Sequence, residues 1–127
     1  MQENQLFEYA VIRLVPRVDR EEFLNIGVIL YCAKQKFLGV TFELNENKIK
    51  NLFPDTDLEE IEHHLKTFEK ICRGDIDGGP ISKLLASERF RWLTSIRSTI
   101  LQTSKVHPGF TRNASKTLEK LFSQLVL

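Results

Sequence analysis

The sequence predicts an α+β fold in which helices pack on a small antiparallel sheet of three to four strands. Three observations favour this class. Runs of β-branched and aromatic residues fill the first third of the chain, and segments with helical spacing of apolar residues follow. The 127 residues are 42% hydrophobic and 28% charged, which is ordinary for one globular domain. We therefore expect a single domain, residues 1–127, whose strands come before its main helices.

Three strands are expected, at Leu6–Val15, Ile26–Cys32 and Phe37–Leu44. In the first strand both alternating sets of side chains are largely apolar, which is typical of a strand covered on both faces. Pro16 ends it, because proline has no amide hydrogen for the ladder. Only four residues separate the second and third strands, so these two should form an antiparallel hairpin.

Two helices are expected next. The first, Lys48–Phe53, is short because a proline follows it. The second, Asp57–Arg73, has apolar residues recurring at helical spacing on one face. Thr56 and Glu59 fit a capping box, with Thr56 as the N-cap. Gly74 fits the residue that follows a helix C-terminus.

The remaining elements are expected in the last third of the chain. Pro80–Ala86 fits a short helix opened by its proline. Phe90–Thr103 has both helical spacing and strand-like alternation, and we favour a fourth strand at Thr99–Thr103. Residues 107–113, HPGFTRN, are expected to be a loop whose last asparagine caps a final helix, Ala114–Val126.

The composition also indicates where the protein works. No apolar run approaches the roughly 20 residues of a membrane span, and the N-terminus lacks the basic flank of a secretory signal. Cys32 and Cys72 lie far apart in apolar patterns, which favours two buried free thiols in a reducing cytosol over a disulfide or a metal site. We expect a cytoplasmic protein with no membrane association.

The usual catalytic and cofactor signatures are missing from the sequence. It contains no GxGxxG or P-loop, no HExxH, no paired CxxC and no nucleophile elbow. We therefore expect no metal and no cofactor, and no residue is assigned a catalytic role.

Charge is distributed unevenly along the chain, although the net charge is only +1. Residues 43–62 hold seven acidic and two basic side chains, whereas residues 83–127 hold eight basic and two acidic ones. A basic third fits an acidic partner or a nucleic acid, and a solvated charged face is the simpler alternative. Since no helix concentrates these charges, an acidic partner surface is favoured over duplex DNA.

Polar residues in the first two strand runs are the main candidates for a binding site. Arg13 lies between apolar neighbours, where an unpaired guanidinium is costly to bury. Glu22 and Asn25 are its candidate partners, and we expect the three to be neighbours with Arg13 paired to the carboxylate. The alternative is an anion-binding or partner-binding cluster of Arg13, Arg17, Arg20 and Asn25.

Arg97 and His107 are the candidate contacts of the basic third. His107 lies in the expected loop, where it could contact a phosphate or act as an acid–base group. No nucleophile or metal cluster accompanies it in the sequence, so a binding role is favoured over catalysis.

The segment FEYAVIRLVPRVDREEFLNIGVILYC resembles the bacterial and phage family called Domain of Unknown Function 3037. The similarity is carried by a strand of the form Y-x-V-x-R-x-x-P and by E-F-x-N-x-G-V-I-L, and the later FRWLTSIRSTILQTSKVHPGFT resembles a second family block. The matching positions of the first two motifs are Tyr9, Val11, Arg13, Pro16, Glu22, Phe23, Asn25, Gly27, Val28, Ile29 and Leu30. The resemblance implies a bacterial cytoplasmic protein. It also implies a protein partner, a Hip-type (toxin-like) serine/threonine kinase.

Three classes of function are compatible with these observations. A non-catalytic interaction or regulatory protein, a companion of such a kinase, ranks first. A nucleic-acid-binding module that uses the basic C-terminal third ranks second. A small enzyme ranks third, since it requires Arg13, Glu22, Asn25 and His107 to converge on one pocket.

Overall fold

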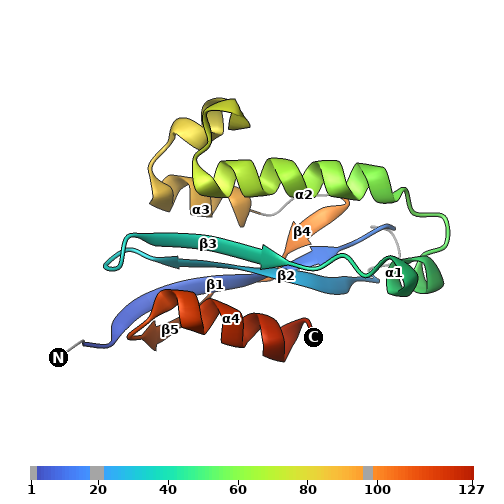
Figure 1. Cartoon of the computed structure of the whole chain (residues 1–127). Coiled ribbons are helices and arrows are strands. Elements are labelled where there is room, and N and C mark those ends of the chain that lie inside the picture. Colours follow the sequence, from blue (N-terminus) through green and yellow to red (C-terminus); the bar gives the residue numbers. More distant parts are fainter. Residues whose placement is uncertain (1–2, 18–21, 96–98) are drawn as a thin grey trace.

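The fold is a five-stranded antiparallel sheet with helices on both faces, seen edge-on in Figure 1. It was obtained as a computed structural model, which describes residues 3–17, 22–95 and 99–127. The strand order is β3-β2-β1-β4, and β5 also pairs with β1. The expected α+β class is confirmed, with one strand more than the three to four predicted.

The three predicted strands are present as β1 (Gln5–Leu14), β2 (Leu24–Cys32) and β3 (Phe37–Phe42). β1 pairs with β2, and β2 pairs with β3 through the predicted hairpin. β1 and β2 are buried on both faces, as their apolar sequences indicate.

The expected loop at residues 107–113 is wrong, because most of it forms a strand. β4 (Leu101–Thr103) and β5 (His107–Thr111) both pair with β1. Pro108 and Gly109 are common in loops, but β5 lies at the edge of the sheet, where proline is tolerated. A Cβ atom at position 109 would lie 2.6 Å from Cζ of Phe7, so the glycine makes room for this ring.

β4 and β5 behave as one strand interrupted by a bulge. Three residues, 104–106, lie opposite the two residues of β1 between Tyr9 and Ile12. Ser104 closes this gap: its amide donates to the carbonyl of Val11, and its hydroxyl accepts from the amide of Val11, both at 2.8 Å. The strand therefore follows β1 along almost its whole length.

A second bulge lies in β2 at Ile26. Ile12 pairs with Gly27 but Arg13 pairs with Asn25, so Ile26 has no direct partner on β1. Its side chain is buried among residues of the core that faces α2. The bulge leaves Asn25 beside Arg13 on the opposite face of the sheet.

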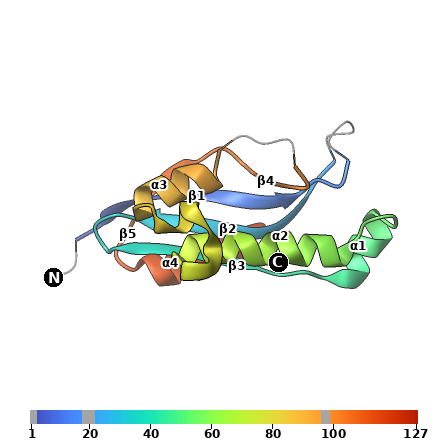
Figure 2. The ribbon, with the colours of Figure 1, turned by 90° about the horizontal axis from the view of Figure 1, so that it is seen from above.

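One face of the sheet, which we call the α2 face, is covered by α2 (Leu58–Arg73) and α3 (Ala86–Leu93). Figure 2 shows α2 running lengthwise over the β3 side of the sheet, with α3 beside it. α1 (Glu46–Leu52) precedes α2, and two 3₁₀ turns, Ile76–Gly78 and Pro80–Lys83, connect α2 to α3.

Several helix boundaries differ from the predicted ones. The N-cap of α2 is Asp57 and not Thr56, because the Asp57 carboxylate accepts from the amides of Glu59 and Glu60. The expected helix at Pro80–Ala86 is only a 3₁₀ turn. In the ambiguous segment Phe90–Thr103, the helical spacing belongs to the end of α3 and the strand-like alternation to the short strand β4, which is the favoured fourth strand.

The other face, which we call the α4 face, is covered by α4 (Ala114–Leu125), capped by Asn113 as predicted. α4 packs over β2 and β3, and its Leu118 meets Val28, Leu30 and Cys32 of the sheet. The two predicted main helices therefore lie on opposite faces, and β1 and β2 contribute to both cores.

Both cysteines are buried free thiols, as predicted. Burial raises the pKa of Cys72 to about 12, so its reactive thiolate is strongly disfavoured. No helix in the described part of the chain is long and apolar enough to cross a membrane.

Candidate functional site

Arg13 and Asn25 are direct cross-strand neighbours on the α4 face, next to the bulge at Ile26. The Asn25 amide nitrogen donates to the carbonyl of Leu125 at 3.3 Å, so it holds the end of α4 against the sheet. The predicted proximity of Arg13 and Asn25 is confirmed.

The predicted ion pair between Arg13 and Glu22 is wrong. Among the described residues, no carboxylate lies within ion-pair distance of Arg13. Its guanidinium carbon instead lies 4.2 Å from the ring centroid of Phe23, a cation–π geometry. Phe23 takes the place beside Arg13 that was expected for Glu22, which lines a cavity elsewhere.

Two polar atoms at this site have no hydrogen-bond partner. Nε of Arg13 and Oδ1 of Asn25 are both buried from solvent and unbonded. One is a donor and the other an acceptor, and they belong to facing residues on one side of the sheet. Buried polar atoms without partners are uncommon in native proteins, and Nε of Arg89, away from this site, is a third one among the described residues.

Three exposed apolar residues adjoin this polar pair: Phe23 stacks on Arg13, Leu125 accepts a hydrogen bond from Asn25 through its carbonyl, and Leu127 lines a cavity with Asn25. Phe23 is 49% exposed, and at the end of α4 Leu125 is 36% and Leu127 71% exposed. We call this set of residues the Arg13 patch: Arg13, Phe23, Asn25, Leu125 and Leu127. An arginine stacked on an aromatic ring among apolar groups is the composition typical of an interaction hot spot.

Arg17 and Glu22 lie at the same end of the sheet but line a separate cavity of about 400 Å³. Asp55, Asp57 and Glu60 also line it, so its character is mainly acidic. Arg20 lies outside the described residues. Of the four residues of the predicted cluster, Arg13 and Asn25 are therefore direct neighbours, and Arg17 lines this separate acidic cavity.

His107 is not part of the Arg13 patch. It pairs with Tyr9 across the strands, and the two rings have centroids 5.4 Å apart. Tyr9 and Arg13 lie on the same face of β1 but four residues apart, which is about 13 Å along a strand. The convergence of Arg13, Glu22, Asn25 and His107 required by the enzyme hypothesis does not occur.

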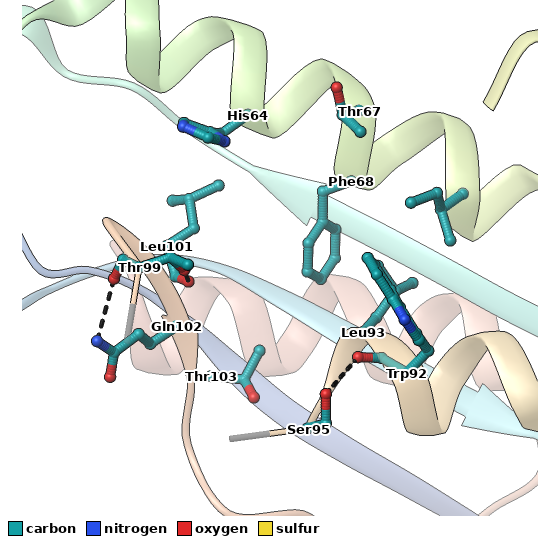
Figure 3. A pocket seen from close by; sticks show the side chains of 11 residues that line it. His64, Thr67, Phe68, Trp92, Leu93, Ser95, Thr99, Leu101, Gln102 and Thr103 are labelled. Atoms are coloured by element: carbon teal, nitrogen blue, oxygen red, sulfur yellow. Dashed lines mark hydrogen bonds between the residues drawn. The ribbon is translucent and has the colours of Figure 1, made fainter. Parts of the chain in front are cut away.

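A second cavity, of about 160 Å³, lies between α2, α3 and β4. Figure 3 shows Phe68 reaching into it from α2, with Trp92 on one side and β4 on the other. Its volume suits one small ring. The hydroxyl of Ser95 donates to the Trp92 carbonyl at 2.8 Å, and the hydroxyl of Thr103 donates to the Thr94 carbonyl at 3.3 Å. Both hydroxyls are therefore bonded to backbone carbonyls and are not arranged as nucleophiles.

In the part of the chain that is described, no three His, Cys, Asp or Glu residues gather in a group that could hold a metal ion. His64 lies 3.7 Å from Glu60 one turn away on α2, an exposed pair on a helix surface.

A second polar contact lies at the opposite end of the sheet. There the β2–β3 hairpin lies against the start of α4, and both lie beside β5 in Figure 1. The side chain of Gln35 makes this contact: its oxygen accepts from the amide of Ala114 at 2.8 Å, and its nitrogen donates to the carbonyl of Thr111 at 3.4 Å. Four cations lie within two residues of this contact in the sequence, and we call them the hairpin-end cluster: Lys34, Lys36, Arg112 and Lys116.

Sequence reasoning placed only half of this cluster. Arg112 and Lys116 belong to the basic third, but Lys34 and Lys36 are about 80 residues earlier in the chain. No local sequence pattern predicts that the two segments meet, and nothing in the sequence distinguishes Gln35 from an ordinary hairpin residue. Arg97, predicted as a contact in the basic third, lies outside the described residues.

The fold defines a small α+β protein with helices on both faces of an antiparallel sheet. Residues 9–126 match the family described as "Protein of unknown function (DUF3037)". The chain therefore belongs to this family, as its first two strands and the block at residues 90–111 indicate. No curated protein and no solved structure matches the chain.

Proposed function

We propose that this chain is a non-catalytic bacterial interaction protein of the cytoplasm that docks a partner protein through the Arg13 patch. The observation that carries the proposal is Arg13 itself. Its guanidinium is stacked on a half-exposed ring and has no carboxylate partner among the described residues. Of the two interpretations of Arg13, a structural ion pair and a binding group, this geometry supports the second, because no carboxylate among the described residues pairs with the guanidinium.

The partner's contact is expected to combine a carboxylate with apolar side chains. A guanidinium binds a carboxylate in a planar, bidentate arrangement, and stacking on Phe23 holds it in one orientation. Leu125 and Leu127 offer exposed apolar area next to it. The family resemblance supplies the first partner to test, a Hip-type serine/threonine kinase.

The proposal is tested by calorimetric titration of the full chain into a purified Hip-type kinase encoded beside a gene of this family. Phe23→Ser and Arg13→Gln should each weaken binding by about 30-fold, the loss expected of a hot-spot residue. Leu85→Ser is the matched control, because Leu85 is 70% exposed on the opposite face and should leave the affinity unchanged. Absence of binding by the wild-type chain would contradict the kinase assignment, and unchanged affinity in both patch variants would contradict the docking surface.

A further inference from the structure

β3 forms one edge of the sheet, and its outer side has no partner strand among the described residues. All its residues pair with β2, and none of its backbone groups bonds to any other described part of the chain. Each of its six residues is partly exposed, although the helices of both faces pack on this strand. In Figure 1 no helix or loop crosses in front of β3. The strand therefore presents an open edge to its surroundings.

The pairing of β3 with β2 determines which of its backbone groups face outward. The amide of Glu43, directly after β3, donates to the carbonyl of Ile26 at 2.8 Å. Along an edge strand of an antiparallel sheet, residues that bond to the neighbouring strand alternate with residues whose amides and carbonyls point away from it. Counting back from Glu43, the backbone groups that point away from β2 are those of Leu38, Val40 and Phe42.

This edge lacks the features that normally prevent a strand edge from pairing with another chain. β3 has the sequence FLGVTF, which contains no charged residue and no proline, and its register with β2 is regular. The edge on the other side of the sheet contains both a proline, Pro108, and the bulge at residues 104–106. A regular apolar edge on one side, with a protected edge on the other, favours the addition of a strand at β3.

We propose that β3 pairs antiparallel with β3 of a second copy of this chain, so that the two sheets join into one. With the two-fold axis at Val40, every outward-facing residue meets an outward-facing one, and Leu38 lies opposite Phe42 of the second copy. The charges favour this occupant, because Lys36 directly precedes β3 and Glu43 directly follows it. Antiparallel self-pairing therefore brings Lys36 of each copy next to Glu43 of the other, at both ends of the joined strands.

The test is sedimentation velocity of the full chain at concentrations from about 1 µM to about 500 µM, where the wild-type chain should form dimers. Lys36→Glu and Glu43→Lys should each weaken dimerisation by about tenfold, because both ends of the interface then carry like charges. An equimolar mixture of the two variants should restore the wild-type affinity, since a mixed dimer again has opposite charges at both ends. Lys105→Glu, an exposed position on the other edge of the sheet, is the matched control and should leave dimerisation unchanged.

Amide hydrogen exchange locates the interface within the dimer. The amides of Leu38, Val40 and Phe42 should exchange at least about tenfold more slowly in the dimer than in the dilute chain. Those of Gly39 and Thr41, which the same alternation bonds to β2, should exchange slowly in both states.

Four results would each overturn the proposal. They are a chain that stays monomeric over the whole range, a dimer unaffected by both charge reversals, a mixture that associates no better than either variant alone, and a dimer in which the outward-facing amides gain no protection. None of them bears on the kinase titration, because the Arg13 patch contains no residue of β3.

Discussion

Gly27 is the residue at which the sheet has least room for a side chain. A Cβ atom there would lie 2.6 Å from the carbonyl oxygen of Thr41 and 2.8 Å from Cβ of Phe42. The first contact is with backbone of the paired strand, which cannot move aside as a flexible side chain can. This close backbone approach stands directly beside the bulge of β2, which lies one residue earlier at Ile26.

Gly27→Ala should therefore destabilise the protein by about 1–3 kcal/mol, the usual cost of overpacking a well-filled core. The measurement is the free energy of unfolding from urea titration followed by circular dichroism. A loss below about 0.5 kcal/mol would mean that β2 and β3 separate more easily than this geometry implies.

Only some residues of the Arg13 patch could be predicted from the sequence. Arg13 is conspicuous in sequence because a cation between apolar strand residues is unexpected, and Asn25 follows as its neighbour. Phe23 is not conspicuous, since a phenylalanine before an apolar strand reads as core. Only the bulge at Ile26, which sets the register of Asn25 against Arg13, places Phe23 on the surface beside the guanidinium.

At the scale of elements, the N-terminus of α2 has two candidate N-caps in the sequence, Thr56 and Asp57, and the structure uses Asp57. Asp57→Ala should lower the free energy of unfolding by about 1 kcal/mol, because the Asp57 carboxylate accepts from two amides of the first turn. Thr56→Ala is the matched control and should cost little, since Thr56 is not the cap. The free energies of unfolding of both variants are measured by urea titration. A larger loss in Thr56→Ala than in Asp57→Ala would mean that Thr56, as in the predicted capping box, is the N-cap.

Elements with long periodic patterns were predictable, and so was the short strand β4, but the edge strand β5 was not. α2 and α4 have several turns of consistent apolar spacing, so their positions follow from sequence alone. β5 is held by pairing with β1, a contact between residues about 100 positions apart, and its own proline and glycine indicate a loop. Local signals cannot reveal a strand whose stability comes from a distant partner.

At the scale of the whole molecule, two hydrophobic cores lie on opposite faces of one sheet. β1 and β2 contribute side chains to both, so neither core can lose its packing without exposing part of the other. This arrangement supports the interpretation of residues 1–127 as one cooperative unit.

The protein should therefore unfold in a single transition. Fluorescence of Trp92, the only tryptophan of the chain, reports on the α2 face, and far-ultraviolet circular dichroism reports on the helices of both faces. The two signals should give the same midpoint in a urea titration. Separate midpoints would mean that α4 detaches from the sheet before the rest unfolds.

The position of α4 after every strand has a consequence during protein synthesis. Phe7, Val28, Leu30 and Cys32 are among the early residues to leave the ribosome, yet the helix that covers them begins only at Ala114. For most of translation, one side of a nascent sheet therefore presents an uncovered apolar strip of the kind that chaperones bind and that aggregates readily. Messages cut short before the codons of α4 should accordingly yield insoluble or degraded product even when all five strands are encoded.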